Sequence, residues 1–441
     1  MPRRLIKLLG LDRSVALAGV GRGLGMVLGP IGSVVVVWTL SAQEQGLYYL
    51  FLSLVSLKAF FDLGASASIA QMTPHLCKAN GDGTEGPDSS FIHVAVSWMN
   101  KVALGFGLFC GVFGIGYLYW SGQASVATQA MWLATVCTTA LTGSQEGRLQ
   151  VVYGSGRVDA ISKLRFSSLL VQYPVQWVLL LSGASLFSFS ASALAVYIFQ
   201  RMTLRRKFPA LWPSGDFSGV RAKELKTELG FLIRRASLTY ISGVLVSQVQ
   251  QPIVFKTLGP EQSAKLGLSG MIGSTLIGLS SLWCLTMFPR FARKVAEGAI
   301  QDAYRDFRMT FLRTVAVATG GFAAALVAIS FLHYIPRFSE RLMSIPQVLP
   351  LFAALWLGNI ALSMTYWPRS FKVEPFAMVA CSQMIVSPLA VWFFSRWLGL
   401  TGVGWGNLCS WIVGVFGIAL VTRRFIPSFD RRPKVSALDI T

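Results

Sequence analysis

The chain has 441 residues, of which 53% are hydrophobic and only 13% are charged. Soluble globular proteins carry about 25% charged residues, so this composition excludes a soluble fold and predicts a membrane protein. The net charge of +20 does not predict a nucleic-acid partner, because the basic residues are confined to short segments between long apolar runs, as in membrane-protein loops.

Apolar runs of membrane-spanning length recur along the chain. A spanning helix needs about 20 mainly apolar residues, and this criterion predicts twelve spans. They lie near residues 15–40, 47–73, 100–120, 127–146, 166–184, 186–203, 233–256, 267–289, 314–333, 347–368, 375–395 and 402–422. The sequence therefore predicts an all-α integral membrane protein with twelve transmembrane helices.

Lysine and arginine are unequally distributed between alternate loops. Of the 39 basic residues, 32 lie on the side that holds both termini and five lie on the opposite side. Basic loops stay in the cytoplasm, so both termini are predicted to be cytoplasmic. The opposite loops are very short, and no extracytoplasmic domain is expected.

The longest inner connection divides the predicted spans into two sets of six. We expect an N-terminal lobe over 1–205, a cytoplasmic linker over 206–232, and a C-terminal lobe with a basic cytoplasmic tail over 233–441. The next inner segment, 290–314, places aromatic residues among charges at near-helical spacing. This pattern predicts a helix that lies along the cytoplasmic interface.

Both halves open with a similar turn. The first span is followed by TLSAQEQG at 39–46, and the seventh by TLGPEQ at 257–262, with Gly267 opening the eighth span. A six-span unit keeps its orientation when it is repeated. The two lobes are therefore predicted to be parallel repeats with a substrate path between them.

The usual signatures of enzymes are absent from the sequence. It contains no GxxxxGK[ST] loop, no HExxH or GxSxG motif, and no paired carboxylates within a span. The six cysteines form no CxxC pair and the three histidines are scattered, so neither a metal nor another cofactor is predicted. We expect a protein that is not an enzyme.

Charged residues inside the spans are the most informative candidates. A charge near the middle of a spanning helix costs roughly 2.5 to 3.5 kcal/mol, so it normally faces a partner or a water-filled cavity. Three such residues are Arg22, Lys58 and Asp62. Two bases and one acid leave a surplus positive charge for an anionic ligand. The alternative is a structural bridge between Arg22 and Asp62, with Lys58 extending toward the membrane surface.

Further basic residues lie at the predicted cytoplasmic ends of spans: Arg148, Arg234 and Arg235. They either set the topology of the chain or line the inner mouth of a central cavity. Two pairs of amides lie at spacings that place each pair on one helix face: Gln172 with Gln176, and Gln248 with Gln251. They either join helices or, in a cavity, bind sugar hydroxyls.

The segment WTLSAQEQGLYYLFLSLVSLKAFFDLG at 38–64 resembles bacterial O-antigen and capsule polysaccharide flippases. These belong to the superfamily of multidrug, oligosaccharidyl-lipid and polysaccharide exporters. The twelve-span plan agrees over the whole chain, whereas the likeness in sequence is mostly confined to the first two spans. Within that likeness, Arg22 and Lys58 match the positions of cavity cations, and Asp62 matches the acid of the family's DLG segment.

The resemblance implies that the chain moves a polyprenyl-diphosphate-linked oligosaccharide from the inner to the outer leaflet of the bacterial cytoplasmic membrane. It implies alternating access of two lobes, contact with membrane lipids, and a polysaccharide polymerase as a partner. Fixed positive charge in a low-dielectric cavity suits a diphosphate. Relatives that flip the peptidoglycan precursor usually have fourteen spans, two more than are predicted here.

Two alternative functions stay open at this point. A drug or cation exporter of the same superfamily would need an acidic cavity, and the predicted spans carry only Asp62; the first span also lacks the acid that such exporters use for ion coupling. A membrane glycosyltransferase or polymerase would need a sizeable outer loop, and none is predicted.

Overall fold

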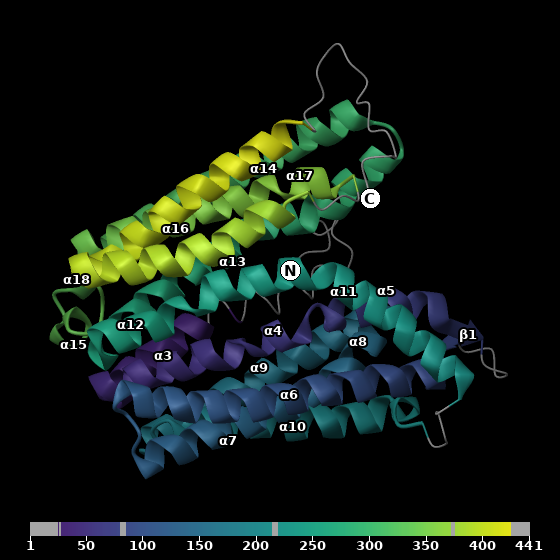
Figure 1. Ribbon diagram of the computed structural model, residues 1–441, viewed down its shortest axis with the longest axis horizontal. Coiled ribbons are helices and arrows are strands. Elements are labelled where there is room, and N and C mark those ends of the chain that lie inside the picture. Colours follow the sequence, from purple (N-terminus) through teal and green to yellow (C-terminus); the bar gives the residue numbers. More distant parts are fainter. Residues whose placement is uncertain (1–24, 26–27, 80–84, 214–218, 372–374, 425–441) are drawn as a thin grey trace, which may run out of the picture. The chain divides into compact units, whose positions relative to one another are not determined.

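The computed structural model describes residues 25, 28–79, 85–213, 219–371 and 375–424, except for the side chains of 235, 236, 238–240 and 289. The chain divides into two compact units, Met1–Gly267 and Leu268–Thr441 (Figure 1). Each unit is a bundle of helices.

The first long helix among the described residues of this unit is Leu28–Thr39. Its further helices are α3 (Ala42–Ser56), α4 (Lys58–Asp62), α5 (Ala65–Met72), α6 (Ser89–Ser121), α7 (Val126–Ser144), α8 (Glu146–Gly154), α9 (Val158–Leu181), α10 (Phe187–Lys207), α11 (Val220–Gln248) and α12 (Gln250–Leu258). Short 3₁₀ turns cover Thr73–Leu76 and Pro209–Leu211. Strand β1 (Cys77–Ala79) pairs antiparallel with β2 (Glu85–Pro87), a small hairpin that the all-α prediction omitted.

Helix α13 (Pro260–Ala296) begins in the first unit and continues into the second. The remaining helices of the second unit are α14 (Ile300–Leu332), α15 (Pro336–Ser339), α16 (Ile345–Met364), α17 (Tyr366–Arg369) and α18 (Ala377–Arg423). Helix α18 contains a non-helical residue, Gly399, with φ 58° and ψ −139°. It therefore comprises two helical segments, which overlap the last two predicted spans.

Local sequence explains several helix ends. Ser41 and Glu44 form a reciprocal capping box at the start of α3, with N–H to oxygen distances of 2.9 and 3.2 Å. The Ser125 hydroxyl caps α7 by accepting from the Thr128 N–H at 3.1 Å. Gly122 ends α6 with φ 77°, a conformation that glycine adopts without steric cost.

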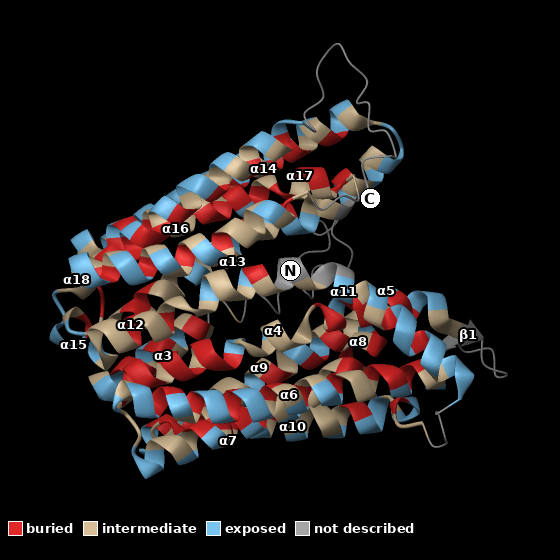
Figure 2. Cartoon of the chain, viewed as in Figure 1, coloured by how far each residue is buried: buried red, intermediate tan, exposed pale blue. Residues whose placement is uncertain are grey.

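Buried and exposed residues alternate along the helices at helical spacing (Figure 2). In the first unit, Phe91 and Ile161 belong to one fully buried cluster, and Leu50 and Trp132 belong to another. Many apolar side chains remain exposed, among them Val112 at 75% and Phe416 at 67%. Exposed apolar surface on this scale suits helices that contact lipid.

Five described helices are long and apolar enough to cross a membrane, or six if the bent pair in residues 42–76 is counted as one span. The prediction of a helical, multi-pass membrane protein is confirmed at this level. Every predicted span from residue 47 onward overlaps at least one helix. The twelve-span count, the two-lobe repeat and the cytoplasmic termini stay predictions, as do the domain boundaries at 205 and 233.

The predicted interfacial helix over 290–314 is wrong. Residues 290–296 continue α13, and residues 300–314 begin α14. The two ends are joined by an ion pair of 2.7 Å between Lys294 and Asp306. The aromatic residues in this segment pack against each other and Trp367: Phe291 and Phe307 are buried there. The helical spacing of these aromatic residues therefore places them in a contact between helices.

Candidate substrate site

The helix of the second predicted span is broken in its middle. Helix α3 ends at Ser56, the short α4 runs from Lys58 to Asp62, and α5 begins only at Ala65. Leu63 and Gly64 have φ values of 51° and 83°, so they cannot continue a right-handed helix. The chain bends by 46° at this point. Broken helices of this kind supply substrate sites in many transporters, because irregular backbone at membrane depth is tolerated only inside protein or beside a cavity.

Lys58 stands at the start of this break. Its side chain is half-buried and lies directly against Gly143 of α7, where an added Cβ atom would be 2.9 Å from Lys58 Cε and 3.3 Å from Nζ. Among the described residues, no carboxylate lies within 4.0 Å of its amino group. Gly143 thus makes room for a cation that forms no ion pair with a described acid.

Asp62 closes α4 and has local partners. Its Oδ1 accepts hydrogen bonds from the Ser66 N–H at 3.1 Å and the Ser66 hydroxyl at 2.9 Å. Negative charge is favoured at a helix N-terminus, so this carboxylate stabilises the first turn of α5. Lys58 and Glu146 both lie within electrostatic range of Asp62. Arg22 lies outside the described residues, and its bridge to Asp62 stays a prediction.

A second helix break, between α7 and α8, contains Gln145. This side chain is fully buried, and neither its Nε2 nor its Oε1 has a hydrogen-bond partner among the described residues. The sequence interpretation missed Gln145. The polar run Ser144–Gln145–Glu146 at the end of an apolar span could have indicated it. Buried amides normally bind protein, water or a ligand, so Gln145 is a candidate ligand contact.

Glu146 follows Gln145 and is neutralised locally. Its Oε1 lies 3.3 Å from Arg165 of α9 and accepts a hydrogen bond from Gln150 at 2.5 Å. The two carboxylates near the break, on Asp62 and Glu146, thus already have partners. The described part of this region offers one cation that forms no ion pair within 4.0 Å, Lys58, and one amide that lacks hydrogen-bond partners, Gln145.

Arg148 lies on α8 and stacks over the Trp212 ring, with its Cζ 4.8 Å from the ring centroid. Arg205 approaches the same ring at 5.6 Å. Burial, together with the nearby charges of Arg201 and Arg205, lowers the pKa of Arg148. The structure therefore places Arg148 in an arginine–tryptophan cluster, formed where α8 begins and α10 ends.

The other predicted arginines lie on one helix. Arg234 and Arg235 both fall within α11, and the Arg234 side chain is exposed. The Arg235 side chain lies outside the described part. Helix α11 packs against α4, the short helix that begins with Lys58.

The predicted glutamine pairs have different surroundings. Gln176 is buried and donates to the Tyr48 hydroxyl at 3.1 Å, whereas Gln172 is half-buried. Gln251 is buried and donates to the Ser263 carbonyl at 2.6 Å, which joins α12 to α13. Gln248 ends α11, and its backbone carbonyl accepts from the Ser53 hydroxyl at 2.5 Å. The contacts of Gln176 and Gln251 join helices, the alternative that the sequence left open.

The two similar turns pack against each other within the first unit. A Cβ atom on Gly46 would lie 2.1 Å from the Pro260 carbonyl oxygen, and one on Gly267 would lie 2.2 Å from Cγ of Tyr49. Gly46 thus admits a residue of the second turn, and Gly267, which follows that turn, admits Tyr49, which follows the first. The Tyr117 hydroxyl adds a hydrogen bond of 2.6 Å to the Pro252 carbonyl. These contacts hold α12 and the start of α13 against α3 and α6.

Within the described ranges, no group of three or more histidine, cysteine or acidic residues could hold a metal ion. The sequence matches no family model, and no curated protein matches it significantly.

Solved structures nevertheless share the fold over almost the whole chain. The lipid II flippase MurJ, in an inward closed conformation, is 11% identical with a TM-score of 0.69, over 92% of this chain and 87% of that one. An inward-facing multidrug resistance MATE family transporter is 12% identical with a TM-score of 0.65, over 94% and 99%. A MOP superfamily transporter from Pyrococcus furiosus, described as having a binding pocket of reversed polarity, is 13% identical with a TM-score of 0.60, over 94% and 96%.

These neighbours are membrane transporters and flippases, not enzymes. The TM-scores of 0.60 to 0.69 show a shared fold, and identities of only 11 to 13% leave the substrate open. The chain is therefore a multi-pass membrane protein with the fold of MOP superfamily transporters.

Proposed function

We propose that this protein flips a polyprenyl-diphosphate-linked oligosaccharide from the inner to the outer leaflet of the bacterial cytoplasmic membrane, for surface polysaccharide synthesis. One observation carries the proposal. Lys58 lies in a broken helix, beside a glycine that makes room for it, and no described carboxylate lies within 4.0 Å of its amino group. A diphosphate that enters such a site gains a charge-assisted hydrogen bond.

The chemistry favours an anionic substrate over a cation. Asp62 already accepts two hydrogen bonds from Ser66, and Glu146 is paired with Arg165. A cation exporter would need a carboxylate without such partners. The fold itself serves both kinds of transport, since its neighbours include a lipid II flippase and multidrug resistance transporters. A glycosyltransferase or polymerase has no support from these neighbours.

In this proposal Lys58 binds the diphosphate, with Arg22 as a second cation. Gln145 offers an amide to the same ligand or to the first sugar. The polyprenyl chain stays in lipid, and the two lobes alternate in access. Three arginines attract the anionic carrier from the cytoplasmic side: Arg148, Arg234 and Arg235. A polysaccharide polymerase remains a proposed partner, but the flipping step itself does not need it.

Complementation of a bacterial strain that lacks its own polysaccharide flippase tests the proposal. Lys58→Ala should reduce surface polysaccharide by roughly 10- to 100-fold, since a hydrogen bond to a charged group contributes about 1.5 to 3 kcal/mol. Lys58→Arg should retain part of the activity. Lys163→Ala, at an exposed lysine of α9, is the matched control. Normal surface polysaccharide from well-expressed Lys58→Ala would contradict the assigned role.

Gln145→Leu separates a ligand contact from a structural role. Removal of buried polar atoms that lack partners should leave the melting temperature unchanged or raise it. If Gln145 binds substrate, the same variant should lose transport. A variant that is both stable and fully active would remove Gln145 from the site.

A further inference from the structure

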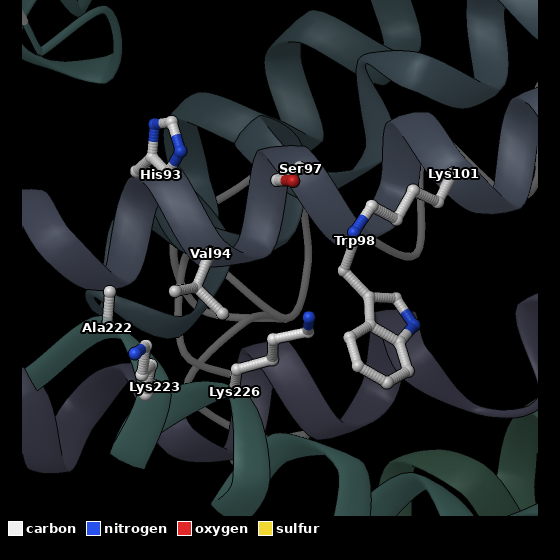
Figure 3. Close-up of a pocket in the computed structure, with 8 residues that line it drawn as sticks. All are labelled: His93, Val94, Ser97, Trp98, Lys101, Ala222, Lys223 and Lys226. Atoms are coloured by element: carbon white, nitrogen blue, oxygen red, sulfur yellow. The ribbon is translucent and has the colours of Figure 1, made fainter. Parts of the chain in front are cut away.

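A basic pocket lies between α6 and α11, apart from the helix break that the proposed function uses. It has a volume of about 190 Å³ and is lined by His93, Val94, Ser97, Trp98, Lys101, Ala222, Lys223 and Lys226 (Figure 3). No acidic residue is among its lining residues. Three lysines thus converge on one concave site, which makes it attractive to an anion.

The two helices supply the lysines from opposite sides. Lys101 comes from α6, and Lys223 and Lys226 come from the first turns of α11. All three side chains are exposed, and no described carboxylate lies within 4.0 Å of any of them. In Figure 3 the Lys226 side chain extends from α11 toward α6. The nearby acids Asp88 and Glu224 both pair with Arg221 instead.

Trp98 fixes the spacing of the two helices. It packs against the buried cluster that contains Leu225 and Leu229, and a Cβ atom on Gly230 would lie 3.7 Å from its ring. The pocket is therefore built on a packed framework. Tryptophan is also the residue that membrane proteins favour at the level of lipid headgroups.

Beside the pocket, the exposed face of α6 changes from polar and basic residues to apolar ones. An adjoining hollow of about 370 Å³ is lined by His93, Val96, Ser97, Asn100, Lys101 and Leu104. Beyond it, the same face continues with Leu104, Leu108 and Val112, whose side chains are 62%, 65% and 75% exposed. Spacings of three or four residues keep these positions on one side of a helix. The basic pocket thus opens onto an apolar stripe.

We propose that this pocket binds the phosphate headgroup of an anionic phospholipid whose acyl chains lie along Leu104, Leu108 and Val112. Three lysines supply charge for the phosphate, and the stripe supplies contact for the chains. In the predicted orientation this end of α6 is cytoplasmic, the leaflet that carries anionic lipid. A free phosphate would use only the lysines, and the stripe favours a lipid. The site is independent of the proposed transport substrate.

Native mass spectrometry of the full chain, purified and supplied with phosphatidylglycerol or phosphatidylcholine, tests the site. Wild type should retain phosphatidylglycerol more strongly than phosphatidylcholine. The triple variant Lys101→Gln, Lys223→Gln, Lys226→Gln should lower phosphatidylglycerol affinity on the order of 100-fold, because each lysine near an anionic lipid contributes about fivefold. The double variant Lys163→Gln, Lys207→Gln, at exposed lysines outside the pocket, is the control.

Equal retention of phosphatidylglycerol by the triple variant and the control would overturn the proposal. Two competition arms identify the occupant. If inorganic phosphate alone displaces the lipid at equal concentration, the pocket is a phosphate site without lipid specificity, and the proposal is wrong. If a short prenyl diphosphate binds there and phosphatidylglycerol does not, the pocket belongs to the transported substrate, and the proposal is likewise wrong.

A third variant tests the stripe separately. Leu108→Gln leaves every lysine in place and should weaken phosphatidylglycerol retention while leaving competition by inorganic phosphate unchanged. Unaltered lipid retention would remove the stripe from the site and overturn the assignment to a phospholipid.

Discussion

The close contact between the two similar turns predicts that Gly46→Ala destabilises the protein. This residue lies in α3, and a Cβ atom there would be 2.1, 2.7 and 3.0 Å from the carbonyl oxygen, carbonyl carbon and Cα of Pro260. All three atoms belong to the backbone, so no side chain can rotate away. An ordinary carbon–oxygen contact is about 3.3 Å or longer. In Gly46→Ala, α3 and the start of α13 must therefore separate by about 1 Å.

The magnitude follows from two opposing effects. Alanine in place of a glycine inside a helix stabilises by roughly 0.5 to 1 kcal/mol. Overpacking of a close contact costs about 1 to 3 kcal/mol, and sometimes more. Because the clash is against rigid backbone, we expect the cost to exceed the gain. Gly46→Ala should destabilise the protein by about 1 to 2 kcal/mol.

Thermal denaturation in detergent, followed by size-exclusion chromatography, measures this effect. Gly116→Ala is the matched control, since it lies in α6 and an added Cβ would meet nothing within 4 Å. The control should melt at or slightly above the wild-type temperature, and Gly46→Ala should melt below it. If Gly46→Ala melted with or above the control, the close packing of the two turns would be refuted.

Three further substitutions test contacts of the first unit. Tyr117→Phe removes the hydrogen bond to the Pro252 carbonyl and should lower the unfolding free energy by about 1 kcal/mol, seen as a lower melting temperature. Trp132→Ala empties a fully buried site and should cost about 3 to 5 kcal/mol, seen as a loss of folded protein on expression. Asp62→Ala removes the acceptor for Ser66 and should cost about 0.5 to 2 kcal/mol, whereas Asp62→Asn should recover most of that stability; equal losses would contradict the capping role.

The sequence predicted the class of protein and one part of the candidate site. Composition and apolar runs predicted a helical membrane protein, and every predicted span from residue 47 onward overlaps at least one helix. The cost of a buried charge indicated Lys58 as a site residue, and its role in binding stays a prediction. Both inferences depend on local properties of the chain, namely hydropathy over about 20 residues and the cost of a charge in lipid.

The sequence did not predict how these segments break and pair. The second span reads as one apolar run, yet Leu63 and Gly64 adopt positive φ and divide it. The sequence also did not predict that Gln145 is buried without hydrogen-bond partners, or that Lys58 contacts Gly143. A positive φ at a leucine is locally unfavourable, so it persists only where surrounding packing holds it.

The turns at 39–46 and 257–262 also separate what the sequence predicts from what only the structure shows. Their likeness is visible in the residues alone, since a repeat needs only self-comparison. That Gly46 contacts Pro260 and Gly267 contacts Tyr49 follows only from the fold, because residues more than 200 positions apart must be brought together. Local properties of the chain, namely its hydropathy and the cost of a charge in lipid, decided which segments are helices and where charge is costly. Packing between distant segments decided where helices break, which polar groups are left to meet a ligand, and where lysines converge.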